Sequence, residues 1–397
     1  MSLNSTVSAE RPHIAFFGRR NAGKSSVVNA VTGQRISVVS ETLGTTTDPV
    51  KKAMELLPLG PVVIIDTPGF DDEGALGELR VERTLEVLRR TDIAVLVVDG
   101  TVGLTDADEK LIHEFVSRGL PYLIAINKID LAEEPPQWDE HTACVSALTG
   151  EGIGELKERL AHIIDSEDKE KYIVADLVEE GDIVVLVIPI DESAPKGRII
   201  LPQQQTLREL LDHHCTVVCC QDTELKTTLS KLSGKPALVI TDSQAFRRVS
   251  ADVPADIPLT SFSILFARYK GDLDSLIQGA NMLKNLQNGD QILISEGCTH
   301  HRQCGDIGTV KLPAWIRGYS GAEPEFSFTS GGTFPDDLSE YKVIVHCGGC
   351  MLNEKEMKHR QNAAKAAGVP MVNYGIAIAA MNGILDRALQ PVKGMLI

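Results

Sequence analysis

One short segment constrains the fold of this chain more than any other feature of its sequence. Gly18-Arg-Arg-Asn-Ala-Gly-Lys-Ser25 matches the phosphate-binding loop G-x-x-x-x-G-K-[ST]. It follows an apolar run, His13–Phe17, and precedes a helical pattern, which is the strand–loop–helix arrangement that such a loop requires. Glycines let the backbone wrap around phosphate groups, and a helix N-terminus favours anions. The segment therefore predicts a nucleotide-binding α/β domain.

Two segments predict the groups that contact phosphate and metal. Lys24 is expected to bridge the β- and γ-phosphates, and the Ser25 hydroxyl is expected to ligate Mg²⁺. Asp66-Thr-Pro-Gly69 ends a second apolar run. Asp66 supplies a carboxylate for the Mg²⁺ shell, and the Gly69 N–H faces the γ-phosphate. We expect Lys24, Thr46, Asp66 and Gly69 to act in catalysis.

Two later segments predict the base that is bound. Asp130, in Asn127-Lys-Ile-Asp130, can accept hydrogen bonds from both N1–H and the 2-amino group of guanine. Adenine lacks this pair of donors and would leave the carboxylate unpaired. Ser146-Ala-Leu148 supplies backbone N–H groups toward the guanine O6, so the sequence predicts GTP. The predicted nucleotide-binding residues are Gly18, Arg19, Arg20, Asn21, Ala22, Gly23, Lys24, Ser25, Ser26, Asn127, Lys128, Asp130, Ser146, Ala147 and Leu148.

Strand-like and helical patterns alternate along the chain, which indicates an α/β fold with a parallel sheet in the N-terminal part. A charged stretch, residues 165–171, is the predicted linker to two smaller α/β blocks. The expected strands are His13–Phe17, Pro61–Asp66, Ile93–Asp99, Tyr122–Asn127, Thr142–Ser146, Asp182–Ile190, Thr216–Cys220, Ala237–Ile240, Gln291–Ser295 and Lys342–His346. A Gly-rich loop is expected over Gly318–Gly332.

The segment between the first two nucleotide motifs predicts slow hydrolysis. Gly44-Thr-Thr-Thr-Asp48 resembles the switch segment of bacterial GTPases of tRNA modification and ribosome assembly, which implies that Thr46 contacts Mg²⁺. Ras-like enzymes orient the attacking water with a Gln after Asp-x-x-Gly, and Phe70 stands here instead. In potassium-activated relatives the residue at the position of Asn21 coordinates K⁺. The alternative is that Asn21 only stabilises the loop turn.

The charge balance argues against two classes of partner. Lys and Arg number 39 against 55 Asp and Glu, which gives a formal net charge of −16. Phosphate backbones and anionic lipids repel such a chain. No apolar run approaches the roughly 18 residues of a membrane helix. We expect a cytoplasmic protein that binds neither nucleic acid nor membrane.

Cysteine and histidine spacing near the C-terminus predicts a metal site. Cys298-Thr-His300 is followed by His346-Cys347-Gly-Gly-Cys350. A Cys-x-x-Cys turn presents two thiolates to one metal centre, and a reducing compartment disfavours disulfides. Three thiolates and an imidazole can hold zinc, thiolates can hold an iron–sulfur cluster, and the cysteines can also be unrelated reduced thiols.

A GTPase domain followed by this cysteine pattern resembles the family of FeFe-hydrogenase maturation GTPases over the whole chain. The resemblance implies that Cys298, Cys347 and Cys350 bind a 4Fe–4S cluster, with His300 or His346 as a candidate for the remaining iron. It implies a homodimeric scaffold or carrier that delivers the diiron subcluster to apo FeFe-hydrogenase, with the radical maturases of the same pathway as partners. The expected domains are 1–168 (GTP-binding P-loop), 176–265 (dimerisation) and 270–397 (iron–sulfur cluster).

The sequence leaves alternatives of a different class. A ribosome- or tRNA-associated GTPase with a zinc-stabilised C-terminal domain fits the nucleotide motifs equally well, although the acidic charge opposes it. A metallochaperone for another metal, such as nickel, would be expected to carry His-rich tracts. The expected activity is slow, potassium-stimulated GTP hydrolysis, and the expected cofactors are GTP, Mg²⁺, a 4Fe–4S cluster and K⁺.

Overall fold

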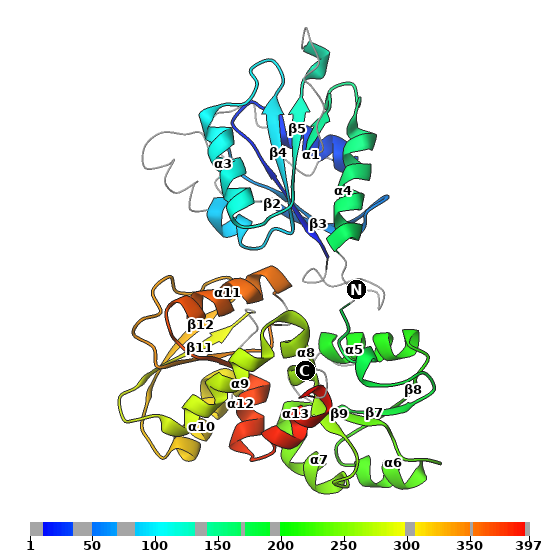
Figure 1. Ribbon diagram of the computed structural model, residues 1–397, viewed down its shortest axis with the longest axis vertical. Helices are drawn as coiled ribbons and strands as arrows, with labels where there is room; N and C mark the ends of the chain where they lie inside the picture. The colour runs from blue at the N-terminus through cyan, green and yellow to red at the C-terminus, as the bar shows by residue number, and fades with distance from the viewer. Residues whose placement is uncertain are drawn as a thin grey trace. The chain divides into compact units, whose positions relative to one another are not determined.

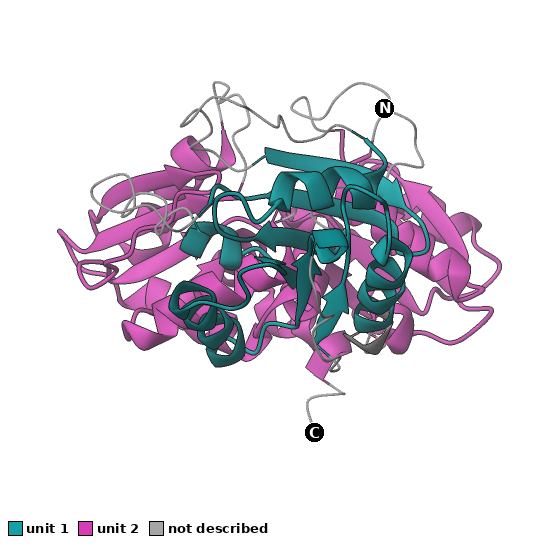
Figure 2. Cartoon of the chain, turned by 90° about the horizontal axis from the view of Figure 1, so that it is seen from above, with its two compact units in different colours: residues 1–169 teal, residues 170–397 magenta. Residues whose placement is uncertain are grey.

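The computed structural model describes residues 11–34, 50–69, 84–131, 141–167, 171–190, 199–297, 306–349 and 352–393. The chain divides into two compact units, Met1–Lys169 and Glu170–Ile397. Figure 1 colours the chain by residue number, and Figure 2 gives each unit its own colour. Within the described ranges, no helix combines the length and the apolar character that crossing a bilayer requires.

The first unit is built on a six-stranded sheet with the order β2-β3-β1-β4-β5-β6. All strand pairs are parallel except β2 with β3, which is antiparallel. The strands are β1 (His13–Phe17), β2 (Val50–Leu56), β3 (Gly60–Asp66), β4 (Ile93–Asp99), β5 (Tyr122–Asn127) and β6 (Thr142–Cys144), and the helices include α1 (Lys24–Thr32), α3 (Asp106–Ser117) and α4 (Ile153–Glu167).

Alternation along β1 explains why helices cover both faces of this sheet. Ile14 and Phe16 belong to the core cluster that also contains residues of α1 and α4. Ala15 and Phe17 belong to the cluster on the other face, with Phe115 of α3. Successive side chains of a strand point to opposite faces, so a continuous apolar run is required where both faces are covered. The predicted α/β class is confirmed.

The second unit contains two four-stranded sheets in which every pair is parallel, with the orders β10-β9-β7-β8 and β12-β11-β13-β14. The strands are β7 (Ile183–Val187), β8 (Thr216–Cys220), β9 (Leu238–Thr241), β10 (Leu259–Ser261), β11 (Gln291–Glu296), β12 (Glu325–Ser330), β13 (Val343–His346) and β14 (Met371–Asn373). The helices are α5 (Leu201–Asp212), α6 (Leu225–Lys231), α7 (Phe246–Asp252), α8 (Phe262–Lys270), α9 (Leu273–Met282), α10 (Leu312–Ser320), α11 (Glu354–Ala366), α12 (Tyr374–Met381) and α13 (Leu385–Lys393).

The two sheets of the second unit share one hydrophobic core. A single cluster of buried side chains includes Leu186 of β7 and Ile294 of β11, together with Leu389 of α13. The last helix also reaches the first sheet through polar contacts. Arg387 of α13 donates hydrogen bonds to the carbonyl oxygens of three residues that precede β10: Ser250 at 3.0 Å, Val253 at 2.9 Å and Pro254 at 2.7 Å.

Two predictions about the elements need correction. The expected loop over Gly318–Gly332 contains the end of α10 and all of β12, so that prediction is wrong. Strand β2 was not predicted, because Lys51 and Lys52 are exposed on this antiparallel strand at the edge of the sheet and leave little apolar signal. The domain boundaries 1–168, 176–265 and 270–397 stay a prediction.

Candidate functional site

The phosphate-binding loop joins β1 to α1, and two of its residues have backbone conformations that explain their type. Gly23 has a φ of +85°, and a Cβ atom there would lie 2.2 Å from Nδ2 of Asn127. Any side chain there would therefore be strained and would collide with the Asn127 side chain at the end of β5. Asn21 is exposed and has a φ of 62°, a left-handed conformation that asparagine adopts more readily than most residues. The loop conformation is thus fixed by local residue choice.

Three side chains predicted to contact phosphate and Mg²⁺ meet at the carboxyl ends of β1 and β3. The Lys24 Nζ group forms an ion pair with Asp66, and the Ser25 hydroxyl donates to Oδ2 of Asp66 at 3.0 Å. Lys24 is 9% exposed and Asp66 is 7% exposed. The ammonium, the hydroxyl and the carboxylate therefore lie at one partly buried point, and this donor set fits a phosphate with its Mg²⁺.

The predicted base-binding segments are tied to the phosphate loop through one buried amide. Asn127 donates from Nδ2 to the Ala22 carbonyl at 3.0 Å and accepts from the Ala147 N–H at Oδ1, also at 3.0 Å. Ser146 donates from Oγ to Oδ1 of Asp130 at 2.6 Å. Asn127 thus joins three segments that are far apart in the sequence, and Ser146 orients the carboxylate predicted to read guanine.

Two acidic residues of this unit were missed by the sequence reasoning. Asp99, at the end of β4, pairs with Lys128 at 2.5 Å, and Asp108 of α3 pairs with Arg19 at 3.3 Å. Burial opposes ionisation of Asp99, yet hydrogen bonds from Lys128 and Thr101 hold the pKa of its carboxyl below the usual range. No sequence motif predicts these two ion pairs, because Asp99 and Asp108 lie far in the sequence from Lys128 and Arg19, the residues they pair with.

The other predicted nucleotide-site residues have simple placements. Arg20 is exposed in the loop, Leu148 is 85% exposed, and Ser26 lies in the first turn of α1. Gly69 lies just after β3, separated from the strand by Thr67 and Pro68. Thr46 and Phe70 lie outside the described residues.

In the second unit, Cys347 lies at the carboxyl end of β13, beside the end of β11. Its Sγ accepts a hydrogen bond from the Gly297 N–H at 3.0 Å and another from the Gly349 N–H at 3.4 Å. The parallel register that pairs Ser295 with His346 brings these segments together. Gly297 immediately precedes Cys298 in the sequence. Gly297, the last described residue before the predicted Cys-x-His segment, is therefore in contact with the Cys347 thiol.

The surroundings of Cys347 fit a thiolate ligand of an iron–sulfur cluster. Such sulfur atoms are commonly stabilised by hydrogen bonds, and two backbone donors are in place here. Gly349 has a φ of +62°, and a Cβ atom there would lie 2.5 Å from Sδ of Met357, so the turn after Cys347 requires glycine. Cys298, His300 and Cys350 lie outside the described residues, and among those described no group of three metal-ligating side chains occurs.

His346 is fully buried and both of its ring nitrogens are engaged. Nε2 accepts a hydrogen bond from Arg360 at 3.0 Å, so Nδ1 carries the proton and donates to the Cys347 carbonyl at 2.7 Å. Burial, and then the Arg360 charge, lower the pKa of His346 to about 4. In this arrangement His346 is neutral and has no lone pair directed at a metal. His300 then stays the histidine candidate for the remaining iron.

Arg360 organises the polar network behind this loop, and the sequence reasoning did not single it out. It is fully buried, donates from Nε to Glu356 at 2.9 Å and donates from Nη2 to the Gly331 carbonyl at 2.9 Å. Its guanidinium also lies 5.1 Å from the ring centre of Phe334. In the sequence, Glu356 and Arg360 look like an ordinary surface pair one helical turn apart. Only the tertiary structure shows that the pair is buried.

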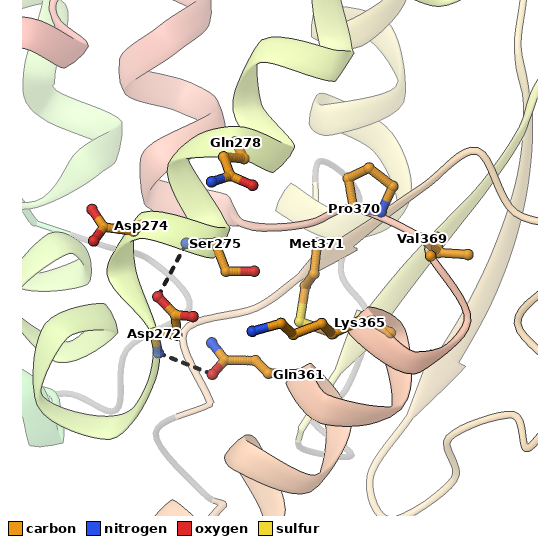
Figure 3. A pocket seen from close by; sticks show the side chains of 11 residues that line it. Asp272, Asp274, Ser275, Gln278, Gln361, Lys365, Val369, Pro370 and Met371 are labelled. Carbon is orange, nitrogen blue, oxygen red and sulfur yellow. Dashed lines mark hydrogen bonds between the residues drawn. The ribbon is translucent and has the colours of Figure 1, made fainter.

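A cavity of about 380 Å³ lies between the start of α9 and the end of α11 (Figure 3). Asp272 and Lys365 contribute charges of opposite sign to its lining. Gln361 accepts a hydrogen bond from the Asp272 N–H at 3.0 Å. Gln361 and Met371 also line a much smaller cavity of about 10 Å³, which Cys347 borders. These two side chains are thus shared by the open cavity and by the small one at the thiol.

Three parts of the chain match models of known protein families. Residues 13–128 match the family model described as "50S ribosome-binding GTPase". Residues 173–271 match "Hydrogen maturase F dimerization domain", and residues 274–391 match "Hydrogen maturase F tetramerization domain". The two hydrogen maturase F matches are consecutive and cover most of the second unit.

Several individual proteins are similar to part of this chain. A tRNA modification GTPase MnmE of Nitrosospira multiformis is 35% identical over 158 residues, which are 38% of this chain and 34% of that protein. A GTPase Der of Campylobacter hominis is 30% identical over 184 residues, 43% of this chain and 40% of the relative. The matched region therefore spans well under half the length of either relative. A solved structure titled as a probable GTP-binding protein engB is 24% identical and covers 39% of this chain and 100% of that one, with a TM-score of 0.29.

The order of the matches agrees with the geometry of both sites. The first unit carries a GTPase domain whose phosphate, metal and base motifs converge, and the second unit carries the two domains that are specific to one maturation family. The chain belongs to the hydrogen maturase F family, and its first unit contains a GTPase domain.

Proposed function

We propose that this chain is a GTP-hydrolysing iron–sulfur scaffold and carrier that assembles or delivers the diiron subcluster to apo FeFe-hydrogenase. Family membership supports the pathway. The observation that carries the finer assignment is the Cys347 thiol, which accepts two backbone N–H groups at the edge of β11 and β13, beside the residue that precedes Cys298. A thiol that only packs in a core does not need this polar cradle.

In the nucleotide site, Lys24 would bind the β- and γ-phosphates, and Ser25, Thr46 and Asp66 would hold Mg²⁺. The contact between Lys24 and Asp66 supports this assignment, because each neutralises the other until phosphate and metal take their places. Asp130, held by Ser146, would select guanine. Hydrolysis would be slow because Phe70 cannot orient water, and K⁺ held by Asn21 would stimulate it.

In the second unit, Cys298, Cys347 and Cys350 would hold the 4Fe–4S cluster. When bound, the cluster would supply one iron whose ligand is exchangeable, and a carrier needs such a position because its cargo must attach and leave. His300 would lie near that iron. The chain's own contribution is to fix the Cys347 sulfur with two N–H donors and to keep His346 occupied with Arg360.

Self-association and further partners belong to the same proposal. The family models that match the second unit are named for dimerisation and tetramerisation, which supports association of this chain with itself. We place it in the cytoplasm as a homodimer that meets apo FeFe-hydrogenase and the radical maturases of the pathway.

The test is anaerobic reconstitution followed by measurement of iron, sulfide and zinc per chain, with electron paramagnetic resonance of the reduced protein. Cys347→Ala should lose most of the cluster signal and the ability to activate apo-hydrogenase, while GTP hydrolysis continues at the wild-type rate. Cys219→Ala is the matched control, because Cys219 is an exposed cysteine on β8 outside the motif. Wild-type protein that binds zinc and no sulfide would refute the carrier function and favour the zinc-stabilised GTPase.

A further inference from the structure

Lys270 is a buried lysine at the end of α8. The residue is 4% exposed, although lysine is among the side chains least often buried. Its Nζ group donates to the Leu352 carbonyl at 3.1 Å and to the Gly349 carbonyl at 3.4 Å. The same group lies 5.8 Å from the ring centre of Phe266. The fold therefore buries a lysine side chain, which is energetically costly, at one specific position.

The two carbonyls bound by Lys270 belong to the segment that begins at Cys347. In the sequence, Gly349 and Leu352 stand on either side of Cys350. Lys270 and Cys347 also line the same small cavity, together with His346. The Lys270 ammonium therefore contacts the main-chain oxygen atoms of two residues that follow Cys347 in the sequence.

The usual explanation of a lysine at a helix end does not account for this side chain. A lysine in the last turn commonly interacts with the exposed carbonyls of its own helix. The Lys270 bonds run instead to residues 79 and 82 positions later in the chain. A positive charge taken out of water is retained where anionic groups nearby compensate for its desolvation. Thiolates that hold an iron–sulfur cluster are such groups.

We propose that Lys270 is a positioning residue for the cluster. It holds the carbonyls of Gly349 and Leu352 and places a positive charge near the Cys347 sulfur, with which it lines one small cavity. The inference rests on the proposed function, since it concerns the cluster that Cys347 is proposed to hold. Lys270 belongs to the part of the chain that matches the dimerisation domain, whereas Cys347 belongs to the part that matches the tetramerisation domain. The first domain therefore contributes directly to the site on the second.

Three substitutions separate the two roles of this side chain. Lys270→Met keeps the length and removes both charge and donor, Lys270→Gln keeps a donor, and Lys270→Arg keeps both. The control is Lys358→Met on α11, because that lysine is 54% exposed and pairs with Glu354 at the surface. The proteins are reconstituted anaerobically as full chains. Iron content, the rate of iron release to a chelator and the midpoint potential of the cluster are then measured.

Lys270→Met should bind less iron, release it faster and have a more negative midpoint potential, because loss of a nearby positive charge disfavours the reduced cluster. Lys270→Gln should recover iron content but keep the lower potential. Lys270→Arg should restore the potential, and Lys358→Met should match wild type in all three measurements.

The outcomes that overturn the inference differ from those that overturn the proposed function. If wild-type protein holds the cluster and Lys270→Met has the same iron content and potential, Lys270 is not a positioning residue. If Lys270→Met does not fold, equal potentials for the Gln and Arg variants lead to the same conclusion. If wild-type protein binds no iron and sulfide, the proposed function itself fails, and the inference fails with it.

Discussion

Substitution of Asp130 by asparagine should change the base that the GTPase domain prefers. Ser146 donates to Oδ1 of Asp130 at 2.6 Å, so one carboxylate oxygen already has a partner within the protein. In Asp130→Asn the amide oxygen should stay on the Ser146 hydroxyl, because the NH₂ group cannot accept that proton. The NH₂ group then faces the base. It repels the 2-amino donor of guanine and can donate to the O2 acceptor of xanthine.

The size of the effect follows from the bonds exchanged. A hydrogen bond to a charged group contributes about 1.5–3 kcal/mol, and the amide loses one such bond to guanine and weakens the other. A net loss of about 3 kcal/mol corresponds to a decrease in GTP affinity on the order of 100-fold. Affinity for xanthosine triphosphate should rise by a similar factor, because the new donor replaces a repulsive contact.

Competition binding with a fluorescent nucleotide, in which GTP, xanthosine triphosphate and ATP are the competitors, measures both changes. A double variant, Asp130→Asn with Ser146→Ala, tests the orientation argument. Without the Ser146 hydroxyl the amide can take either orientation, and the preference for the xanthine nucleotide should shrink. A single variant that binds GTP as tightly as wild type, or a wild type that binds ATP equally well, would show that Asp130 does not read the base.

Three further predictions concern both units. GTP hydrolysis should be faster in K⁺ than in Na⁺, and Asn21→Ala should remove the difference; equal rates in the two salts would refute the potassium role. Arg360→Met should lower the unfolding free energy of the second unit by about 3–5 kcal/mol, because it strands the buried Glu356 carboxylate, and Glu356→Gln in the same chain should recover part of the loss in denaturant titrations. In cluster-free protein, the lowered pKa of His346 means that the unfolded chain binds its proton more readily than the native chain. Stability should therefore be complete above about pH 6.5 and fall by on the order of 3 kcal/mol as the pH approaches 4, a dependence that His346→Gln should lack.

The sequence was most informative where one strong local pattern decides the structure. Strands β1, β4 and β5 have the predicted bounds, because their apolar runs are continuous and buried strands of a parallel sheet need such runs. Strand β8 also has the predicted bounds, although it lies at the edge of its sheet and none of its residues is buried. Strand β12 was missed because glycines surround it, and the alternation of Phe326 and Phe328 is short. Pattern reasoning weighted the glycines as loop residues, whereas in the structure they bound a strand.

The residues of the candidate sites also differ in how far the sequence could predict them. Lys24, Ser25 and Asp66 belong to motifs whose spacing is fixed by the nucleotide, so residue type and order were sufficient to find them. Arg360 and Lys270 act through contacts with segments that are distant in the chain, and no local pattern distinguishes them from surface cations. Such partners emerge only when strands and helices have been packed together.

The contacts between α13 and the first sheet of the second unit limit how this unit can be divided into fragments that fold. Leu389 lies in the core common to both sheets, and Arg387 binds the segment before β10. A fragment that ends at residue 271 would lose the helix that covers its sheet, and a fragment that begins at residue 274 would expose that helix to water. The dimerisation and tetramerisation domains match separate family models, but we expect them to resist limited proteolysis as one unit. Either domain expressed alone should be poorly soluble, so the two should be transferred together when fusion proteins are built.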